Sequence, residues 1–205
     1  MRVMTEKDAE DFLEKQGFSI VERMVVKTRQ DIPKAARKIG FPVVLKLSSS
    51  SIIHKTELNA VAVDLKNTLG IANALRKMPK IKNAEFIVQK FVKGNELLIG
   101  LKKDAVFGHV LIFGSGGIYT EIFKDVSMRV LPANRKEIEN MVRETRAFQL
   151  LIARGKKFNM QKLLDVLEKT AKLAAKHPEI KELDINPLIV NEKECLVVDA
   201  RIVFN

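Results

Sequence analysis

The end of the chain alternates apolar and polar residues in two short runs, Glu182–Val190 and Cys195–Ile202. Alternation with a period of two is typical of a β-strand that buries one face. In the first run it places the carboxylate of Asp184 and the amide of Asn186 on one face and Leu183 on the other. The pattern therefore predicts a strand with oxygen ligands along its polar face, and a second strand that pairs with it as a hairpin.

The register of this hairpin decides which polar side chains meet. If the turn centres on Glu192 and Lys193, Asn186 lies directly opposite Asp199. Cross-strand neighbours have Cβ atoms about 4.5–5.5 Å apart, so an amide oxygen and a carboxylate can share one hard cation such as Mg²⁺. The register therefore predicts a metal site made of Asn186 and Asp199. A surface hairpin with scattered polar residues is the alternative that the spacing leaves open.

The rest of the chain mixes helical and strand patterns. Helices are predicted near 5–16, 30–39, 69–77, 134–147 and 160–176, and strands near 18–26, 41–46, 61–65, 85–92, 96–101 and 107–113. Thr5 and Asn134 are suited to cap two of these helices because their side-chain oxygens can accept hydrogen bonds from the first backbone amides.

A short break divides this pattern into two halves. Lys93–Asn95 interrupts two strands and is interpreted as a hinge between two lobes of a single domain. We expect the first lobe at about 20–92 and the second at 93–205. The helix of residues 1–19 should pack on the core.

Two side chains before the hinge carry possible phosphate chemistry. Lys46 ends an apolar strand, where a lysine either extends its stem to reach water or faces an anion. His54 follows the polar stretch Ser48–Ser51, which places it on or beside a loop. A loop histidine can exchange protons or accept a phosphoryl group through a ring nitrogen, and an ordinary solvent-facing histidine is the alternative.

A glycine-rich turn follows the hinge. In Gly114–Gly117 the bare backbone amides can approach an anion closely. The segment Asp125–Arg129 lies just beyond, and the planar guanidinium of Arg129 suits phosphate oxygens. The turn is therefore a candidate anion site, and a tight hairpin with exposed charges is the alternative.

The charge of the chain favours anionic ligands. Its 205 residues carry 36 Lys and Arg against 25 Asp and Glu, a formal net charge of +11. Nucleic acid is not supported, because the basic residues are spread along the chain and there is no Trp and only one Tyr for base stacking. A nucleoside triphosphate, a phosphorylated carrier or an acidic partner fits the charge equally well.

The composition also bears on location. No apolar run approaches the roughly 18 residues that a membrane span requires, so we expect no membrane contact and, by default, a cytoplasmic protein. The single cysteine, Cys195, lies in an apolar strand and is interpreted as a packed thiol and not as a nucleophile.

Several segments in a fixed order carry a resemblance to a known family. They are Phe41–Lys46, His54–Lys55, Gln89–Glu96, Phe107–Gly108, Phe113–Ile118, Glu121, Asp125–Arg129, Leu183–Leu188 and Val198–Arg201. In these segments the chain resembles the ATP-grasp β subunit of the ADP-forming acyl-CoA (acetyl-CoA) synthetases. Its closing hairpin is also similar to that of the succinyl-CoA synthetase β subunit.

The resemblance implies an α+β ATP-grasp fold, in which two lobes with antiparallel sheets clamp ATP. By position, Lys46 is expected to contact the nucleotide phosphates and Glu96 the ribose or adenine side. The cofactor-binding set at the hinge, which offers backbone groups to adenine, consists of Gln89, Lys90, Phe91 and Val92.

The same resemblance assigns the catalytic end of the site. Asn186 and Asp199 are expected to hold Mg²⁺, and Arg129 and the turn with Gly116 and Gly117 to face the phosphates. His54 matches a loop histidine that relays a phosphoryl group to or from the nucleotide. Asp184 matches an acid that supports the phosphohistidine.

The implied reaction is acyl-CoA + ADP + phosphate ⇌ carboxylic acid + CoA + ATP. The chain shows no dinucleotide-type CoA-binding half and no second catalytic histidine, so we expect a hetero-oligomer with a CoA-binding α subunit. The family usually has Ser-Pro-Asp and Gly-Gly around the histidine, where this chain has Ser49–Ser51 and Asn59–Ala60. Another ATP-grasp carboxylate ligase and a non-catalytic nucleotide-binding regulatory subunit therefore remain alternatives.

Overall fold

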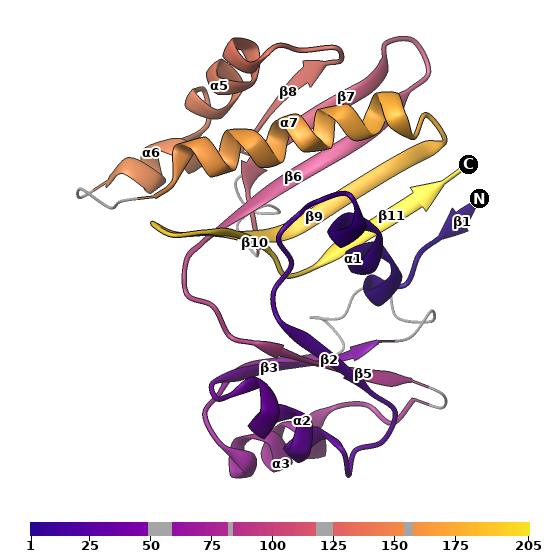
Figure 1. Cartoon of the computed structure of the whole chain (residues 1–205), viewed down its shortest axis with the longest axis vertical. Helices are drawn as coiled ribbons and strands as arrows, with labels where there is room; N and C mark the ends of the chain where they lie inside the picture. Colours follow the sequence, from indigo (N-terminus) through magenta and orange to yellow (C-terminus); the bar gives the residue numbers. More distant parts are fainter. Residues whose placement is uncertain (49–58, 82–83, 118–124, 154–157) are drawn as a thin grey trace. The chain divides into compact units, whose positions relative to one another are not determined.

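The computed structural model describes residues 1–48, 59–81, 84–117, 125–153 and 158–205 (Figure 1). The chain divides into two compact units. The large unit consists of Met1–Ile20 and Lys93–Asn205, and the small unit of Val21–Val92. Each contains an antiparallel sheet with helices, so the predicted α+β class is confirmed.

The large unit is built on a seven-stranded sheet. Its order is β1–β11–β9–β6–β7–β8, and β10 also pairs with β9. The strands are β1 (Arg2–Val3), β6 (Asn95–Asp104), β7 (Gly108–Ser115), β8 (Val126–Val130), β9 (Ile180–Val190), β10 (Cys195–Val197) and β11 (Ala200–Phe204). Every pair in this sheet is antiparallel.

Helices cover one face of this sheet, called the helix face below. They are α1 (Glu6–Lys15), α5 (Arg135–Arg143), α6 (Arg146–Ile152) and α7 (Met160–Lys176). Figure 1 shows α7 running along the sheet, and α1 lies against β11. The core forms where apolar stripes meet, with Leu163 and Leu167 of α7 and Leu183 and Ile185 of β9 all fully or almost fully buried.

Period-two alternation gives the large sheet a second face with different chemistry. In β9 the buried Leu183 and Ile185 alternate with the half-buried Asp184 and Asn186. Glu96 of β6 alternates in the same way with the buried Leu97. The face that carries Glu96, Asp184 and Asn186 is called the second face below.

In its described residues, the small unit is a four-stranded sheet with two helices. The strand order is β2–β5–β3–β4. Its elements are β2 (Arg23–Val26), α2 (Ile32–Ile39), β3 (Val43–Ser48), β4 (Val61–Leu65), α3 (Thr68–Lys77) and β5 (Glu85–Lys90). Leu45, Leu47 and Val88 pack with Ile32 of α2 and Ile71 of α3 in one apolar core. Residues that alternate with them, including Lys46, lie on the sheet face away from the helices.

Two predicted elements are wrong in extent. Only β2, from Arg23, forms a strand within the predicted segment 18–26, and Ile20 instead makes an isolated bridge with Val197 in the large unit. The predicted helix 134–147 is two helices, α5 and α6. They separate because Thr145 has extended dihedral angles and accepts a hydrogen bond from the Phe148 N–H, which starts a new helix.

The remaining helices agree closely with the sequence pattern. Thr5 caps α1 through the Asp8 N–H, and Asn134 caps α5 together with Glu137 in a reciprocal capping box. Among the helices of the described segments, none is long and apolar enough to cross a membrane.

Candidate functional site

The closing hairpin has the predicted register. Cys195 pairs with Val190 at one end, Ala200 pairs with Ile185 beyond the middle, and between them the Asn186 N–H donates to the Asp199 carbonyl at 3.2 Å. The prediction that Asn186 and Asp199 are cross-strand neighbours is therefore confirmed. The ladder is interrupted beside them because Pro187 has no N–H to donate, which leaves β10 and β11 as separate strands.

Asp184 lies on the same face, two residues before Asn186 and two pairs further along the hairpin. It pairs with Arg201 on one side and with Gly100 on the other. The pKa of its carboxyl is raised to about 6, first by burial and then by the charges of Asp199 and Glu182, while Arg201 opposes the shift. The second face therefore concentrates negative charge where the hairpin brings carboxylates together, and a bound cation would relieve that charge.

The glycine run beyond β7 joins this hairpin. The Gly116 N–H donates to the Glu96 carbonyl at 3.0 Å, and the Gly117 N–H donates to Oδ1 of Asn186 at 2.8 Å. The Ser115 N–H is likewise bound within the protein. These amides were predicted to approach an anion. In the structure they hold protein oxygens, and the last of them orients the Asn186 side chain.

Close packing explains why two glycines follow Ser115. A Cβ on Gly116 would lie 2.6 Å from the carbonyl group of Leu97, and a Cβ on Gly117 would overlap the carboxylate of Glu96. Gly117 also has φ +64°, a left-handed conformation that favours glycine. The run therefore brings Glu96, Gly117 and Asn186 into contact.

The side-chain oxygens of Asn186 and Asp199 suit a cation that is also coordinated by water and phosphate oxygens. The described residues contain no group of three or more His, Cys, Asp or Glu placed to hold a metal by themselves. Mg²⁺ typically uses one or two protein oxygens together with water and substrate phosphates, at hard oxygen ligands such as carboxylates and amides. Asn186 and Asp199 fit that pattern, since a carbonyl oxygen keeps a second lone pair when it accepts one hydrogen bond.

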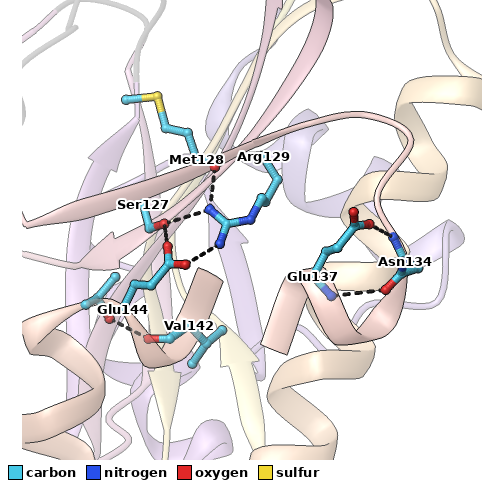
Figure 2. Close-up of polar contacts among 8 residues, drawn as sticks. Ser127, Met128, Arg129, Asn134, Glu137, Val142 and Glu144 are labelled. Carbon is cyan, nitrogen blue, oxygen red and sulfur yellow. Dashed lines mark hydrogen bonds and ion pairs between the residues drawn. The ribbon is translucent and has the colours of Figure 1, made fainter. Parts of the chain in front are cut away.

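Arg129 lies elsewhere. Its pairing partner in β7 is the buried Leu111, so its side chain is on the helix face. Its guanidinium donates to Glu144 at 2.5 Å and to Ser127 at 3.2 Å, and Ser127 also donates to Glu144 (Figure 2). These contacts lower the pKa of Glu144, mainly through Arg129. The structure does not bring Arg129 together with Asn186, because the two side chains are on opposite faces of one sheet.

The predicted nucleotide residues of the small unit share one sheet face. Gln89 pairs with Val44, and Lys46 pairs with Ile87, so both polar side chains point away from α2 and α3. They are almost fully buried, with 5% of Lys46 and 1% of Gln89 exposed. A lysine this buried does not extend into bulk water, and its contact with the nucleotide phosphates stays a prediction.

The hinge amides are partly used within the small unit. The Lys90 N–H donates to the Glu22 carbonyl at 2.9 Å, and the Phe91 N–H donates to the Pro42 carbonyl at 3.0 Å. Val92 is the last residue of this unit. Adenine recognition by this segment therefore has to use groups other than these two amides.

A cavity of about 470 Å³ in the small unit is separate from these residues. It is lined by Lys27, Arg29, Leu47, Pro79, Lys80, Ile81, Ala84 and Phe86. Leu47 and Phe86 belong to the apolar core beneath the helices, whereas Lys46 and Gln89 are on the other face of the sheet. The cavity contains none of the predicted nucleotide residues.

His54 and Glu121 lie outside the described residues. The structure does describe Asn59, five residues after His54, which has φ 52°. Asparagine tolerates this left-handed conformation better than other residues with a Cβ. Asn59 can therefore replace the glycine that the family usually has here. The other histidines have local partners: His109 contacts the Ile180 carbonyl at 2.8 Å and His177 contacts Glu179 at 3.2 Å.

One residue with a clear role was missed as a site residue. Asp125 binds Ser115 and the first amides of α6, which fixes the start of the glycine run. The sequence shows an acid just after the glycine-rich turn. No periodic pattern, however, indicates that this carboxylate binds the start of a helix more than 20 residues later.

The fold and this arrangement define an ATP-grasp protein. The sequence profile of the ATP-grasp domain matches residues 1–204, so the chain belongs to that family. Within it, the chain belongs with the ADP-forming acetate–CoA ligase β subunits. It is 36% identical to acetate–CoA ligase [ADP-forming] I subunit beta of Pyrococcus furiosus, over 98% of this chain and 92% of the relative. The resemblance inferred from the motifs is thereby confirmed.

Other relatives carry the same segment in a longer protein. Acetate–CoA ligase [ADP-forming] I of Archaeoglobus fulgidus is 37% identical over 93% of this chain, which corresponds to 29% of that protein. This chain therefore spans nearly all of the separate β subunit and under a third of the longer enzyme.

Solved structures agree with this assignment. Acetyl-coenzyme A synthetase 1 of Ca. Korarchaeum cryptofilum, in complex with coenzyme A and Ca-AMPCP, has a TM-score of 0.90 and 33% identity, covering 100% of this chain and 94% of that chain. A complex of the same enzyme with Mg-AMPPCP, whose phosphohistidine segment points towards the nucleotide binding site, has a TM-score of 0.82 and 33% identity over 99% and 93% of the two chains.

Proposed function

We propose that this chain is the nucleotide-binding subunit of an ADP-forming acyl-CoA synthetase. In this role it transfers a phosphoryl group between the nucleotide and a histidine during the reaction acyl-CoA + ADP + phosphate ⇌ carboxylic acid + CoA + ATP. The observation that carries the proposal is the direct pairing of Asn186 with Asp199. This pairing occurs in a chain whose similarity to the P. furiosus β subunit extends over 92% of that subunit.

The large unit supplies the metal-binding end. Bound Mg²⁺ neutralises phosphate charge during phosphoryl transfer, which depends mostly on positioning and electrostatic stabilisation. Asn186 and Asp199 present oxygens to this cation, and Gly117 keeps the Asn186 amide in place. Glu96, whose carboxylate packs against Gly117, is proposed to bind the ribose or adenine side of the nucleotide.

The small unit supplies cationic and polar groups. Lys46 is proposed to bind nucleotide phosphate through its ammonium group, and its burial strengthens that attraction because less water screens the charge. Gln89 lies on the same sheet face and, with the segment Lys90–Val92, is proposed to border the adenine.

His54 is proposed to accept the phosphoryl group on a ring nitrogen and to pass it on. Asp184 is proposed to support the phosphohistidine through its carboxyl group. Because relatives occur both as a separate β subunit and within a longer enzyme, we also propose that a CoA-binding α subunit completes the reaction. Arg129 is not included in this set, because it is held by Glu144 on the helix face.

The test is reconstitution. The chain is combined with a CoA-binding subunit encoded in the same genome, ADP, phosphate and a panel of short-chain and aryl acyl-CoAs, and ATP formation is measured. Synthesis of ATP that requires both subunits supports the proposal. A lack of turnover with every acyl-CoA, although both subunits are folded, would contradict it.

A histidine variant separates the alternatives. The His54→Ala variant should lose ATP synthesis and the acid-labile phosphate label that the wild-type chain acquires from ATP. Full activity in this variant would indicate a carboxylate ligase without a phosphohistidine. The altered residues Ser49–Ser51 favour one further alternative, a regulatory subunit, which would bind Mg·ATP and never become labelled.

A further inference from the structure

Asp125 joins the start of α6 to the end of β7. Its carboxylate accepts hydrogen bonds from the N–H groups of Arg146 at 2.9 Å and Ala147 at 2.7 Å, the first two residues of α6. The same carboxylate accepts from the Ser115 hydroxyl at 3.1 Å, and the Asp125 carbonyl accepts from the Ser115 N–H at 3.2 Å. Asp125 therefore holds both the main chain and the side chain of Ser115.

Ser115 is two residues from the contact that orients the candidate metal ligand. Gly117 donates its N–H to Oδ1 of Asn186 at 2.8 Å. On the other side of Ser115, a Cβ on Gly114 would overlap the Asp125 carbonyl, so β7 and the start of β8 touch directly. A shift of Asp125 therefore displaces the segment whose last amide fixes Asn186.

The chemistry of these contacts requires a carboxylate at position 125. Three donors converge on its two oxygens, and an ionised carboxylate is an acceptor only. In an Asp125→Asn variant of the same shape, one oxygen becomes an NH₂ group that faces at least one N–H or hydroxyl donor. The variant keeps the volume of the side chain and removes at least one of the three hydrogen bonds to it.

We propose that Asp125 is a positioning residue for the metal-binding hairpin, which acts through Ser115 and Gly117 on the amide of Asn186. The proposal rests on the proposed function, because it assumes that Asn186 binds the cation carried by the nucleotide. Asp125 itself touches neither nucleotide nor metal in this scheme. Its loss should appear as weaker binding of the Mg·nucleotide, most of all at low Mg²⁺ concentration, and not only as lower stability.

Three variants separate positioning from helix stability. Ser115→Ala removes the side-chain hydrogen bond to Asp125, and it leaves the main-chain bond and the α6 amides bound. Thr145→Val is the matched control, because the Thr145 hydroxyl accepts from the Phe148 N–H of the same helix and donates to the Val142 carbonyl at the end of α5, away from Ser115. Asp125→Asn affects both the bond to Ser115 and the bonds to the α6 amides. Each full-length variant is titrated with the analogue Mg·AMPPCP by calorimetry at several Mg²⁺ concentrations, and its thermal midpoint is measured.

The expected result is a split between the variants. Ser115→Ala and Asp125→Asn should bind Mg·AMPPCP about 10- to 100-fold more weakly, the range typical of groups that orient a metal ligand, with the deficit largest at low Mg²⁺. Thr145→Val should lower the thermal midpoint and bind like the wild type. If Ser115→Ala binds like the wild type, or Thr145→Val weakens binding equally, the positioning role is wrong. If the wild-type chain binds no Mg·AMPPCP, the proposed function fails instead.

Discussion

Asn186 and Asp199 face each other across the closing hairpin, joined by a main-chain hydrogen bond of 3.2 Å from the Asn186 N–H to the Asp199 carbonyl. The side-chain amide of Asn186 is fixed separately, by the N–H of Gly117 at 2.8 Å. Two independent contacts therefore determine where the Asn186 oxygen lies. Such preorganisation favours cation binding because little side-chain freedom remains to be lost.

The first prediction concerns these two residues. Asn186→Ala and Asp199→Asn should each weaken binding of Mg·ADP by at least about tenfold, since removal of a ligand costs no less than removal of a group that orients one. Binding is measured by calorimetry at fixed Mg²⁺, and ATP synthesis with the α subunit should fall in parallel.

A control in the same hairpin isolates the effect of charge. Glu192 is exposed in the turn between β9 and β10, so Glu192→Gln removes one negative charge without touching the paired residues. Its Mg·ADP binding should equal that of the wild type. Equal losses in Glu192→Gln and Asp199→Asn would show that general charge, and not ligation, governs binding.

The hairpin could be predicted from the sequence because all its determinants are local. Alternation fixes the face of Asp184 and Asn186, and the position of the turn fixes the register, since a slip of one residue would move every apolar side chain out of the core. The structure has that register without change from Cys195 to Val203. Likewise the helix α7 was predicted with correct bounds, because its apolar stripe is long and uninterrupted.

The parts that sequence alone did not give depend on distant partners. Arg129 follows the glycine run, and nothing local shows that its strand puts it beside Glu144 on the helix face. The Gly117 amide similarly finds its acceptor on Asn186, 69 residues away. The glycine run taken alone predicts backbone amides that are available to an anion. Only the assembled sheet shows that these amides donate to Glu96 and Asn186.

The second prediction concerns the single thiol. Cys195 is buried, and burial raises its pKa to about 11, so the nucleophilic thiolate is scarce near pH 8. The native protein should resist modification by a disulfide reagent such as Ellman's reagent, and one equivalent should react after unfolding in denaturant. Rapid reaction of the native protein would contradict the packed position of the thiol.

The raised pKa of Cys195 also has a stability consequence. A group whose pKa is higher in the folded state contributes fully below its unfolded pKa, about 8.5 for a thiol, and loses that contribution as the pH rises towards the folded value. The difference in unfolding free energy between wild type and Cys195→Ala should therefore shrink between those values. Denaturant titrations at several pH values measure it.

The third prediction tests what Arg129 does. Arg129→Met should lower the thermal midpoint at neutral pH, because it removes the guanidinium that binds Glu144 beyond the end of α5 and Ser127 of β8. The pKa of Glu144 is lowered in the folded protein, so its contribution is present above its unfolded pKa and is lost as the pH falls through the folded value. The difference from wild type should therefore shrink below about pH 4.

Nucleotide binding decides between the two interpretations of Arg129. Held on the helix face, it should not contact phosphate, so Arg129→Met should bind Mg·AMPPCP like the wild type. Glu144→Gln should reproduce its thermal effect at neutral pH. A large loss of nucleotide affinity with an unchanged thermal midpoint would instead support the phosphate contact expected from the sequence.

The fourth prediction concerns the glycine run, and the chain offers a matched control. Gly117 and Gly108 both have positive φ, +64° and +75°, so alanine at either position strains the backbone. A Cβ on Gly117 would overlap the Glu96 carboxylate, whereas a Cβ on Gly108 meets nothing within 4 Å. The two variants therefore share the conformational cost and differ only in what the new methyl group displaces.

Both Gly117→Ala and Gly108→Ala should lower the free energy of unfolding, each by about 1 kcal/mol or more, as measured in urea. Only Gly117→Ala should weaken Mg·AMPPCP binding, by at least about tenfold, because moving the Gly117 amide or Glu96 releases the Asn186 side chain. If both variants lose the same affinity, the effect comes from lower stability. If neither does, the contact between Gly117 and Asn186 does not position the cation.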